Sequence, residues 1–225
     1  MRRSLLDGGS TMAMLGPEVP MNPADLATLL GGIDIYLLDQ VLRGRITPEQ
    51  KVFEAGCGSG RNLVYFLRAG FAVAGVDQSA GAIAEVRRVA RELAPAASAA
   101  DFRAEPLETM SFESDRFDVV ISSAVLHFAR DPAHFLAMLH ASWRVLRPGG
   151  LFFCRLASTI GMPERFTALG SGRFLLPDGS QRFLVDEAML LELTERLGGE
   201  LIDPIKTTVV QDQRSMTTWV LRKRG

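Results

Sequence analysis

Hydrophobic residues follow two spacings along the chain, and the alternation of these spacings predicts alternating strands and helices. Short apolar runs predict buried strands at 51–55, 71–76, 101–104, 117–122 and 151–156. After Gly60, Ser79 and Asp131, apolar residues instead recur every three or four positions, which predicts a helix at each place. This order is typical of an α/β protein whose parallel strands are joined by right-handed helical crossovers.

The C-terminal quarter departs from this rhythm. Gly and Pro residues interrupt 157–185, which predicts an inserted segment with little regular structure. A helix is expected from an Asp186 cap to Leu197, followed by strands at 201–209 and 215–221. Because no helix separates those two strands, they must pair antiparallel as a C-terminal hairpin.

The N-terminal end divides into two parts. Residues 1–22 mix Gly, Ser, Thr, Pro and Met without a stable period, so we expect a flexible arm. Residues 23–42 have helical spacing, with Ile35, Leu38, Val41 and Leu42 expected on one face. We therefore interpret 23–225 as a single domain with an insertion at about 157–185.

Composition narrows the classes of partner. The 225 residues are 47% hydrophobic and 23% charged, and a net charge of −1 provides no basic footprint for nucleic acid. No apolar run reaches the length of a membrane span. Cys57 and Cys154 are the two cysteines, and neither belongs to a cluster with metal-ligand spacing. We expect a cytoplasmic protein with free thiols and no metal, nucleic acid or membrane partner; the oligomeric state is left open.

The glycine-rich segment from Glu54 to Gly60 carries the strongest chemical signal. Glycines at 56, 58 and 60 let the backbone turn tightly after a strand and approach a ligand closely, and the next helix offers free N–H groups. Asp77 ends the following predicted strand, where its carboxylate can accept hydrogen bonds from both hydroxyls of a ribose. Together these features indicate a nucleoside cofactor.

A dinucleotide is the alternative cofactor. Its fingerprint needs a small third residue for close packing of the helix on the strand, and Leu63 stands at that position. The sequence thus disfavours an NAD-linked oxidoreductase.

An ordered set of motifs carries a resemblance to a known family. The motifs are Glu54 to Gly60, Asp77, Phe117-Asp118-Val119-Val120, Val125-Leu126-His127 and Arg144 to Gly150. Over about 50–156 the chain resembles the class I S-adenosylmethionine (SAM)-dependent methyltransferases, and it is most similar to the small-molecule branch with the ubiquinone-biosynthesis, trans-aconitate and tellurite-resistance types. The resemblance implies a Rossmann-like three-layer sandwich whose mostly parallel seven-stranded sheet ends in an antiparallel hairpin.

The resemblance also implies roles for individual residues. Gly56, Cys57, Gly58 and Gly60 would form the loop around the methionine and ribose parts of SAM, and Asp77 would hold the ribose. Glu54 would orient that loop or reach the amino group through water. Arg61 would pair with the methionine carboxylate or remain solvated, Gln78 would border the adenine, and Ser122 and Ser123 would face the methionine end.

One position departs from the family pattern. Such enzymes usually carry an Asp that accepts a hydrogen bond from the adenine amino group, and here Pro106 occupies that place. Glu105 or Asp101 would have to substitute for it. Leu107 could still bind adenine through its backbone N–H.

Fewer signals mark the methyl acceptor, which the resemblance implies is a small molecule. His127 follows a predicted strand tip and is either a general base or a structural histidine. Candidate pocket residues are Tyr36, Asp39 and Arg43, with Arg165, Phe166, Arg173 and Phe174 in the insertion, and their arginines hint at an anionic acceptor. A non-catalytic SAM-binding or regulatory protein of the same fold, with S-adenosylhomocysteine (SAH) as a ligand rather than a product, stays the alternative.

Overall fold

A computed structural model describes residues 22–95, 101–162 and 164–225. The predicted arm at 1–22 therefore lies outside the described residues except for Asn22, which caps the first helix. The helices are α1 (Pro23–Leu30), α2 (Ile35–Leu42), α3 (Leu63–Arg68), α4 (Ala80–Leu93), α5 (Pro132–Val145) and α6 (Glu187–Arg196). Within this part of the chain, none of them is long and apolar enough to cross a membrane.

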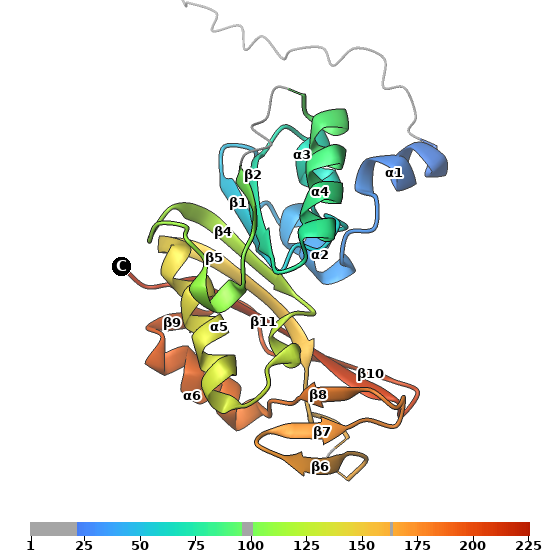
Figure 1. Ribbon diagram of the computed structural model, residues 1–225, viewed down its shortest axis with the longest axis vertical. Helices are drawn as coiled ribbons and strands as arrows, with labels where there is room; N and C mark the ends of the chain where they lie inside the picture. The colour runs from blue at the N-terminus through green and yellow to red at the C-terminus, as the bar shows by residue number, and fades with distance from the viewer. Residues whose placement is uncertain (1–21, 96–100, 163) are drawn as a thin grey trace, which may run out of the picture.

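The central sheet has the predicted mixture of parallel and antiparallel strands (Figure 1). Its strands are β1 (Lys51–Ala55), β2 (Ala72–Asp77), β3 (Phe102–Ala104), β4 (Phe117–Ser123), β5 (Leu146–Ala157), β9 (Gly199–Leu201), β10 (Lys206–Val210) and β11 (Arg214–Lys223). Seven of them follow the order β10-β11-β5-β4-β1-β2-β3, and β9 pairs with β11 as an eighth. The strands from β3 to β5 are parallel and β11 runs antiparallel to β5, so the predicted fold class is confirmed.

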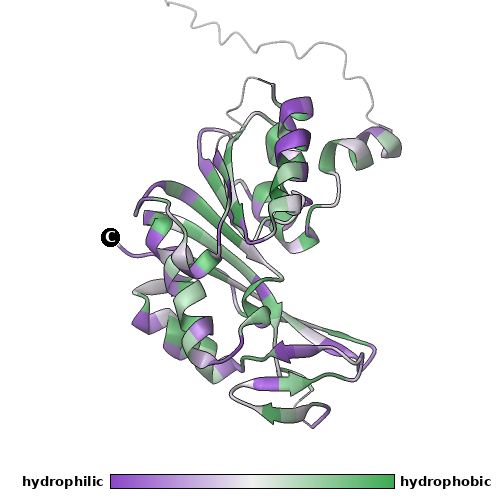
Figure 2. Ribbon diagram, viewed as in Figure 1, coloured by the Kyte–Doolittle hydropathy of each residue, from purple (hydrophilic) through white to green (hydrophobic). Residues whose placement is uncertain are grey.

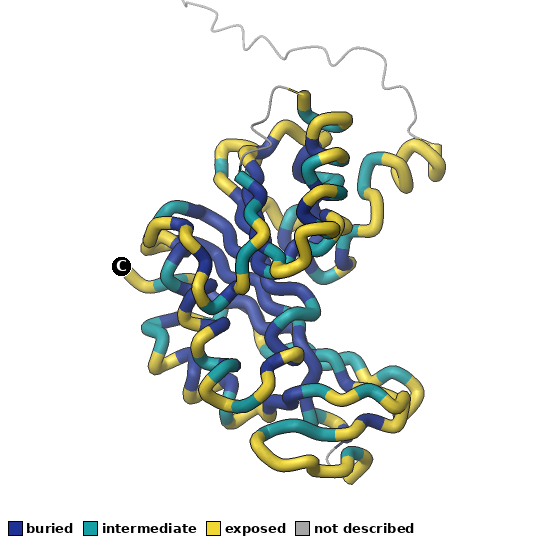
Figure 3. Tube along the Cα trace, in the orientation of Figure 1, coloured by how far each residue is buried: buried dark blue, intermediate teal, exposed yellow. Residues whose placement is uncertain are grey.

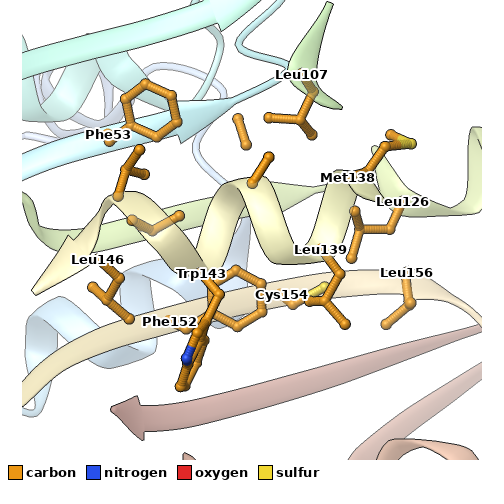
Figure 4. Packing of buried hydrophobic residues seen from close by; sticks show 14 of the residues in the cluster. Phe53, Leu107, Leu126, Met138, Leu139, Trp143, Leu146, Phe152, Cys154 and Leu156 are labelled. Atoms are coloured by element: carbon orange, nitrogen blue, oxygen red, sulfur yellow. The ribbon is translucent and has the colours of Figure 1, made fainter. Parts of the chain in front are cut away.

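Two apolar cores lie on opposite faces of the sheet, because successive strand residues point to opposite sides. α2, α3 and α4 cover one face, and α5 and α6 cover the other. Figure 4 shows the core between α5 and the sheet, where Leu139 and Trp143 of α5 lie beside Phe152 and Cys154 of β5. The central strands are hydrophobic and buried while the outer helix surfaces are hydrophilic and exposed (Figures 2 and 3). These cores fix the carboxyl ends of five parallel strands along one edge.

The segment 157–185 is more regular than its glycines and prolines predict. It contains a separate antiparallel sheet of β6 (Thr167–Gly170), β7 (Arg173–Leu175) and β8 (Gln181–Phe183). The glycines sit in its turns, as at Gly172, whose φ is +74°. Phe183 of β8 is buried and stacks on Phe135 of α5 at a ring distance of 4.8 Å, which fastens the small sheet to the domain.

The buried face of α2 contains only part of the apolar face that the spacing predicts. Leu37, Leu38 and Gln40 are buried, whereas Ile35 and Leu42 are 66% and 77% exposed. Polar contacts set the orientation of α2. The Gln40 amide donates to Asp203 at 3.0 Å, and the N-cap residue Asp34 pairs with Arg155 of β5. Hydrophobic spacing could not reveal it, because the polar Gln40 is buried on this face and the polar Asp34 is buried at its N-cap.

Candidate functional site

The glycine loop after β1 is held between two neighbouring elements. Gly56 and Gly60 have φ values of +67° and +89°. A Cβ at Gly56 would come within 2.7 Å of Val125, and one at Gly60 within 2.6 Å of Val86. At Gly58, which also has a positive φ, an added Cβ would meet no described atom within 4 Å. Protein side chains therefore fill the space beside Gly56 and Gly60, whereas the space beside Gly58 is empty.

Asp77 connects this loop to the next helix. One carboxylate oxygen accepts from the backbone N–H of Gly58 at 2.9 Å, and the other accepts from that of Ser79 at 2.8 Å. Each carboxylate oxygen can accept more than one hydrogen bond, so both keep free capacity. The half-buried side chain is thereby fixed with its carboxylate at the sheet edge.

A pocket of about 280 Å³ opens beside Asp77. Four of the predicted cofactor residues line it: Gly56, Asp77, Gln78 and Leu107. The opposite wall comes from η3 (Leu126–Phe128) and the start of α5, with Phe128, Arg130, His134 and Met138. We call this cavity the first pocket.

The other predicted cofactor residues lie around the first pocket rather than in its wall. Gly58 and Gly60 shape the loop, and the exposed Pro106 caps η2 (Leu107–Thr109). The buried Cys57 lies against Gly75, and the exposed Arg61 lies against Gly32 in the loop before α2. Their roles toward a cofactor stay predictions.

Glu54 begins a chain of buried polar contacts. Its carboxyl accepts from the Asn62 amide at 2.6 Å, the Asn62 oxygen accepts from the Asp34 N–H at 2.9 Å, and Asp34 pairs with Arg155 at 3.0 Å. The second Glu54 oxygen is buried without a partner among the described residues. Burial raises the pKa of Glu54 to about 8, although the Asn62 hydrogen bond opposes the shift. At neutral pH the carboxyl is therefore mostly protonated.

Ser122 and Ser123 end β4 with their hydroxyls turned into the protein. Both side chains are buried, and neither Oγ has a hydrogen-bond partner in the described part of the chain. The next residue, Ala124, has a φ of +61°, which is uncommon without glycine and marks a sharply turned strand end. Neither serine lines the first or the second pocket, so their roles toward a cofactor stay predictions.

The carboxylate near the expected adenine position comes from a residue that we did not predict. Glu105 accepts from the N–H and hydroxyl of Ser111, and Asp101 pairs with Arg116, so neither proposed substitute reaches the first pocket. Glu108 does line it, and its Oε1 lies 3.1 Å from Nε2 of His134. The one-turn helix η2 places the Glu108 side chain toward the first pocket. A helix of three residues is too short to show a hydrophobic period, so the sequence does not indicate which way this side chain points.

His134 also lines the first pocket, although its place within a helix pattern does not set it apart in the sequence. The signal that could have found it is the Asp131 cap: the helix that follows β4 and η3 presents its first turn to the carboxyl edge of the sheet.

His127 is buried behind the strand tip. Its Nδ1 accepts from the backbone N–H of Ala157 at 3.1 Å, so in the neutral ring the hydrogen is on Nε2. Burial lowers its pKa to about 4, with smaller contributions from Arg182 and Arg155. The neutral ring has its single basic nitrogen already occupied, which favours a hydrogen-bond donor over a general base.

A second pocket of about 330 Å³ adjoins the first. Its walls come from the small sheet, the β10–β11 hairpin and the ends of β4 and β5, and include His127, Arg155, Arg182 and Arg214. Ala124 and Phe128 line both pockets. A molecule in one pocket would thus lie next to a molecule in the other.

The residues predicted for the acceptor lie elsewhere. In the described structure none of Tyr36, Asp39, Arg43, Arg165, Phe166, Arg173 and Phe174 lines either pocket. The Tyr36 hydroxyl instead hydrogen bonds to Thr208, and Phe166 and Phe174 pack where the small sheet meets β5. From the same segment, the second pocket is instead lined by Leu176, Asp178 and Ser180, which precede β8, and by Arg182 of β8.

Comparison with known proteins gives one family match and several relatives. Residues 53–154 match the family described as methyltransferase domain. A methyltransferase of Synechocystis is 36% identical over 128 residues, covering 56% of this chain and 57% of that protein. A ubiquinone biosynthesis O-methyltransferase of Bradyrhizobium is 28% identical over 165 residues, covering 66% and 60%. The chain thus spans about three fifths of the length of these two relatives.

Solved structures share the fold. A SAM-dependent methyltransferase from Methanosarcina mazei superposes with a TM-score of 0.68 at 20% identity, covering 82% of this chain and 97% of that one. A Burkholderia thailandensis 1,6-didemethyltoxoflavin-N1-methyltransferase, solved with its acceptor and SAH, gives 0.63 at 21% identity, covering 82% and 76%. The matching segment, the sheet order and the glycine loop with Asp77 thus all resemble those of the class I SAM-dependent methyltransferases.

Proposed function

We propose that the chain binds SAM in the first pocket and transfers its methyl group to a small molecule in the second. The observation that carries this proposal is the junction of the two pockets at Ala124 and Phe128. Methyl transfer needs a donor and an acceptor in line with little water between them, and two adjoining cavities meet that need. The net charge of −1 supports a small molecule over nucleic acid.

The residues present fit the cofactor. Gly58 leaves open space beside the loop, and Asp77 keeps acceptor capacity for ribose hydroxyls. Gln78, Leu107 and Glu108 line the same pocket as Asp77. When bound, SAM supplies an electrophilic methyl group on a positively charged sulfur.

The carboxylate of Glu108 removes the main reason for a non-catalytic alternative. That alternative depended on the missing adenine aspartate, and Glu108 now supplies a carboxylate in the first pocket.

Titration with SAM, SAH and NAD tests the cofactor assignment. We expect binding of the first two, and binding of NAD alone would refute the assignment.

Glu108→Ala is expected to weaken SAH binding by about tenfold, because a hydrogen bond to a charged group contributes roughly 1.5–3 kcal/mol. Calorimetry measures the dissociation constant. Glu105→Ala is the matched control, since that carboxylate binds Ser111 outside the pocket, and its affinity should not change. Equal affinity of the wild type and Glu108→Ala would exclude a role in binding.

His127→Gln is expected to lower the single-turnover rate by less than about tenfold, since a general base typically contributes about a hundredfold or more. Gln can still donate a hydrogen bond, as the Nε2–H of His127 does. His127→Phe, which keeps the ring but loses that donor, should be slower than His127→Gln. If His127→Gln instead loses more than about a hundredfold in rate, His127 acts as a general base.

A further inference from the structure

The second pocket carries an excess of positive charge. Three arginines line it, Arg155, Arg182 and Arg214, against one carboxylate, Asp178. Hydrogen bonds from Ser180 lower the pKa of Asp178, so this carboxylate is ionised at neutral pH. The wall is therefore cationic overall.

Two of the three arginines already have acidic partners. Arg155 pairs with Asp34 at 3.0 Å, and Arg214 faces Asp178 at 3.9 Å. Arg182 forms no ion pair with any residue that the structure describes; its guanidinium donates to the Gln181 carbonyl at 2.8 Å. Arg182 and Arg214 both act on the single carboxylate of Asp178, so the pocket keeps an excess of positive charge, and Arg182 is the arginine without an ion pair among the described residues.

The guanidinium of Arg182 lies close to the wall that the two pockets share. Its guanidinium lies 4.7 Å from the ring centre of Phe128, which lines both cavities. Phe183, the next residue of β8, is buried against α5 and fixes the strand that carries Arg182. An anion bound by Arg182 would lie beside the methyl donor.

The rest of the lining suits an apolar body. Leu176, Val210 and Met216 contribute side chains from the small sheet and the hairpin, and Ala157 lies at the end of β5. Leu176 and Ala157 are buried, so this part of the wall is built into the fold. The combination predicts a ligand with an apolar skeleton and a single negative group.

We propose that the second pocket binds a small organic acid as its anion, with the carboxylate against the guanidinium of Arg182. The planar guanidinium pairs with carboxylates through two parallel hydrogen bonds, which gives orientation as well as affinity. This inference rests on the proposed function, because it identifies the chemical class of the methyl acceptor.

Matched acids and amides test the inference. Benzoate against benzamide, and succinate against succinamide, are titrated into the chain saturated with SAH, with binding followed by ligand-observed NMR. The carboxylate of at least one pair should bind about tenfold tighter than its amide. Arg182→Gln should reduce that ratio to near one, while Arg196→Gln, on the exposed surface of α6, should leave it unchanged.

The two proposals fail in different ways. If SAH binds but acids and amides bind alike, if no carboxylate binds, or if Arg182→Gln keeps the preference, the organic acid is wrong and the cofactor assignment stands. If SAH itself does not bind, the proposed function fails. Arg182→Gln should bind SAH as the wild type does, which shows that the variant is folded.

Discussion

Asp77→Ala should weaken the binding of SAM and SAH by more than tenfold. Its carboxylate carries the ribose contacts in the proposed complex, at roughly 1.5–3 kcal/mol per hydrogen bond to a charged group. It also holds the N–H groups of Gly58 and Ser79, so its loss relaxes the loop around the ligand. Calorimetric titration of the folded variant measures the change.

Ser79→Ala separates binding from helix capping. The Ser79 hydroxyl accepts from Ala82 at the start of α4, and removal of such a cap costs about 1 kcal/mol of stability. This control should lose stability but keep its affinity for SAH. If Asp77→Ala behaves like Ser79→Ala, Asp77 only ends a strand and has no place in the cofactor site. Asp77→Asn serves if the alanine variant does not fold.

Glu54→Gln should make the free protein more stable at alkaline pH. The folded protein keeps a proton on Glu54 up to about pH 8, whereas the unfolded chain releases it near pH 4.5. Between these values the free energy of unfolding of the wild type falls as the pH rises. Because each pKa unit corresponds to about 1.36 kcal/mol, the variant should gain a few kcal/mol over the wild type by pH 8.

Urea denaturation near pH 4.5 and near pH 8 measures this difference. Gln resembles the protonated acid and can still accept from Asn62, so the two proteins should be similar at the lower pH. Glu192→Gln changes an exposed carboxyl on α6 and should show no comparable dependence on pH. If the difference in the free energy of unfolding between Glu54→Gln and the wild type is the same near pH 4.5 and near pH 8, Glu54 is ionised in the folded protein and the account of its burial is wrong.

The framework was readable from the sequence because strong local signals agreed with the fold. The apolar run of β1, the glycines after it and Asp77 at the next strand end each have a short-range cause, and so do the helix caps at Ser79, Asp131 and Asp186. The hairpin followed from the absence of a helix between two strands.

The walls of the two pockets were less accessible to sequence reasoning. Glu108 and His134 are 26 positions apart and meet only because η2 packs beside α5. Arg182, rather than Arg165 or Arg173, lines the second pocket because β8 docks through Phe183. The sequence could not decide between the two roles of His127 for a similar reason: the partner of its ring, Ala157, lies 30 positions away at the end of β5. Such contacts depend on tertiary packing, which no local pattern records.

Transfer of an isotopically labelled methyl group from SAM tests the central claim most directly. The purified chain is incubated with labelled SAM and a small-molecule extract, and both SAH and labelled products are measured by mass spectrometry. We predict that SAH forms in equal amount to a labelled small molecule, and that Asp77→Ala abolishes most of both. Binding of SAH without any transfer of label, or label found only in macromolecules, would contradict a small-molecule methyltransferase.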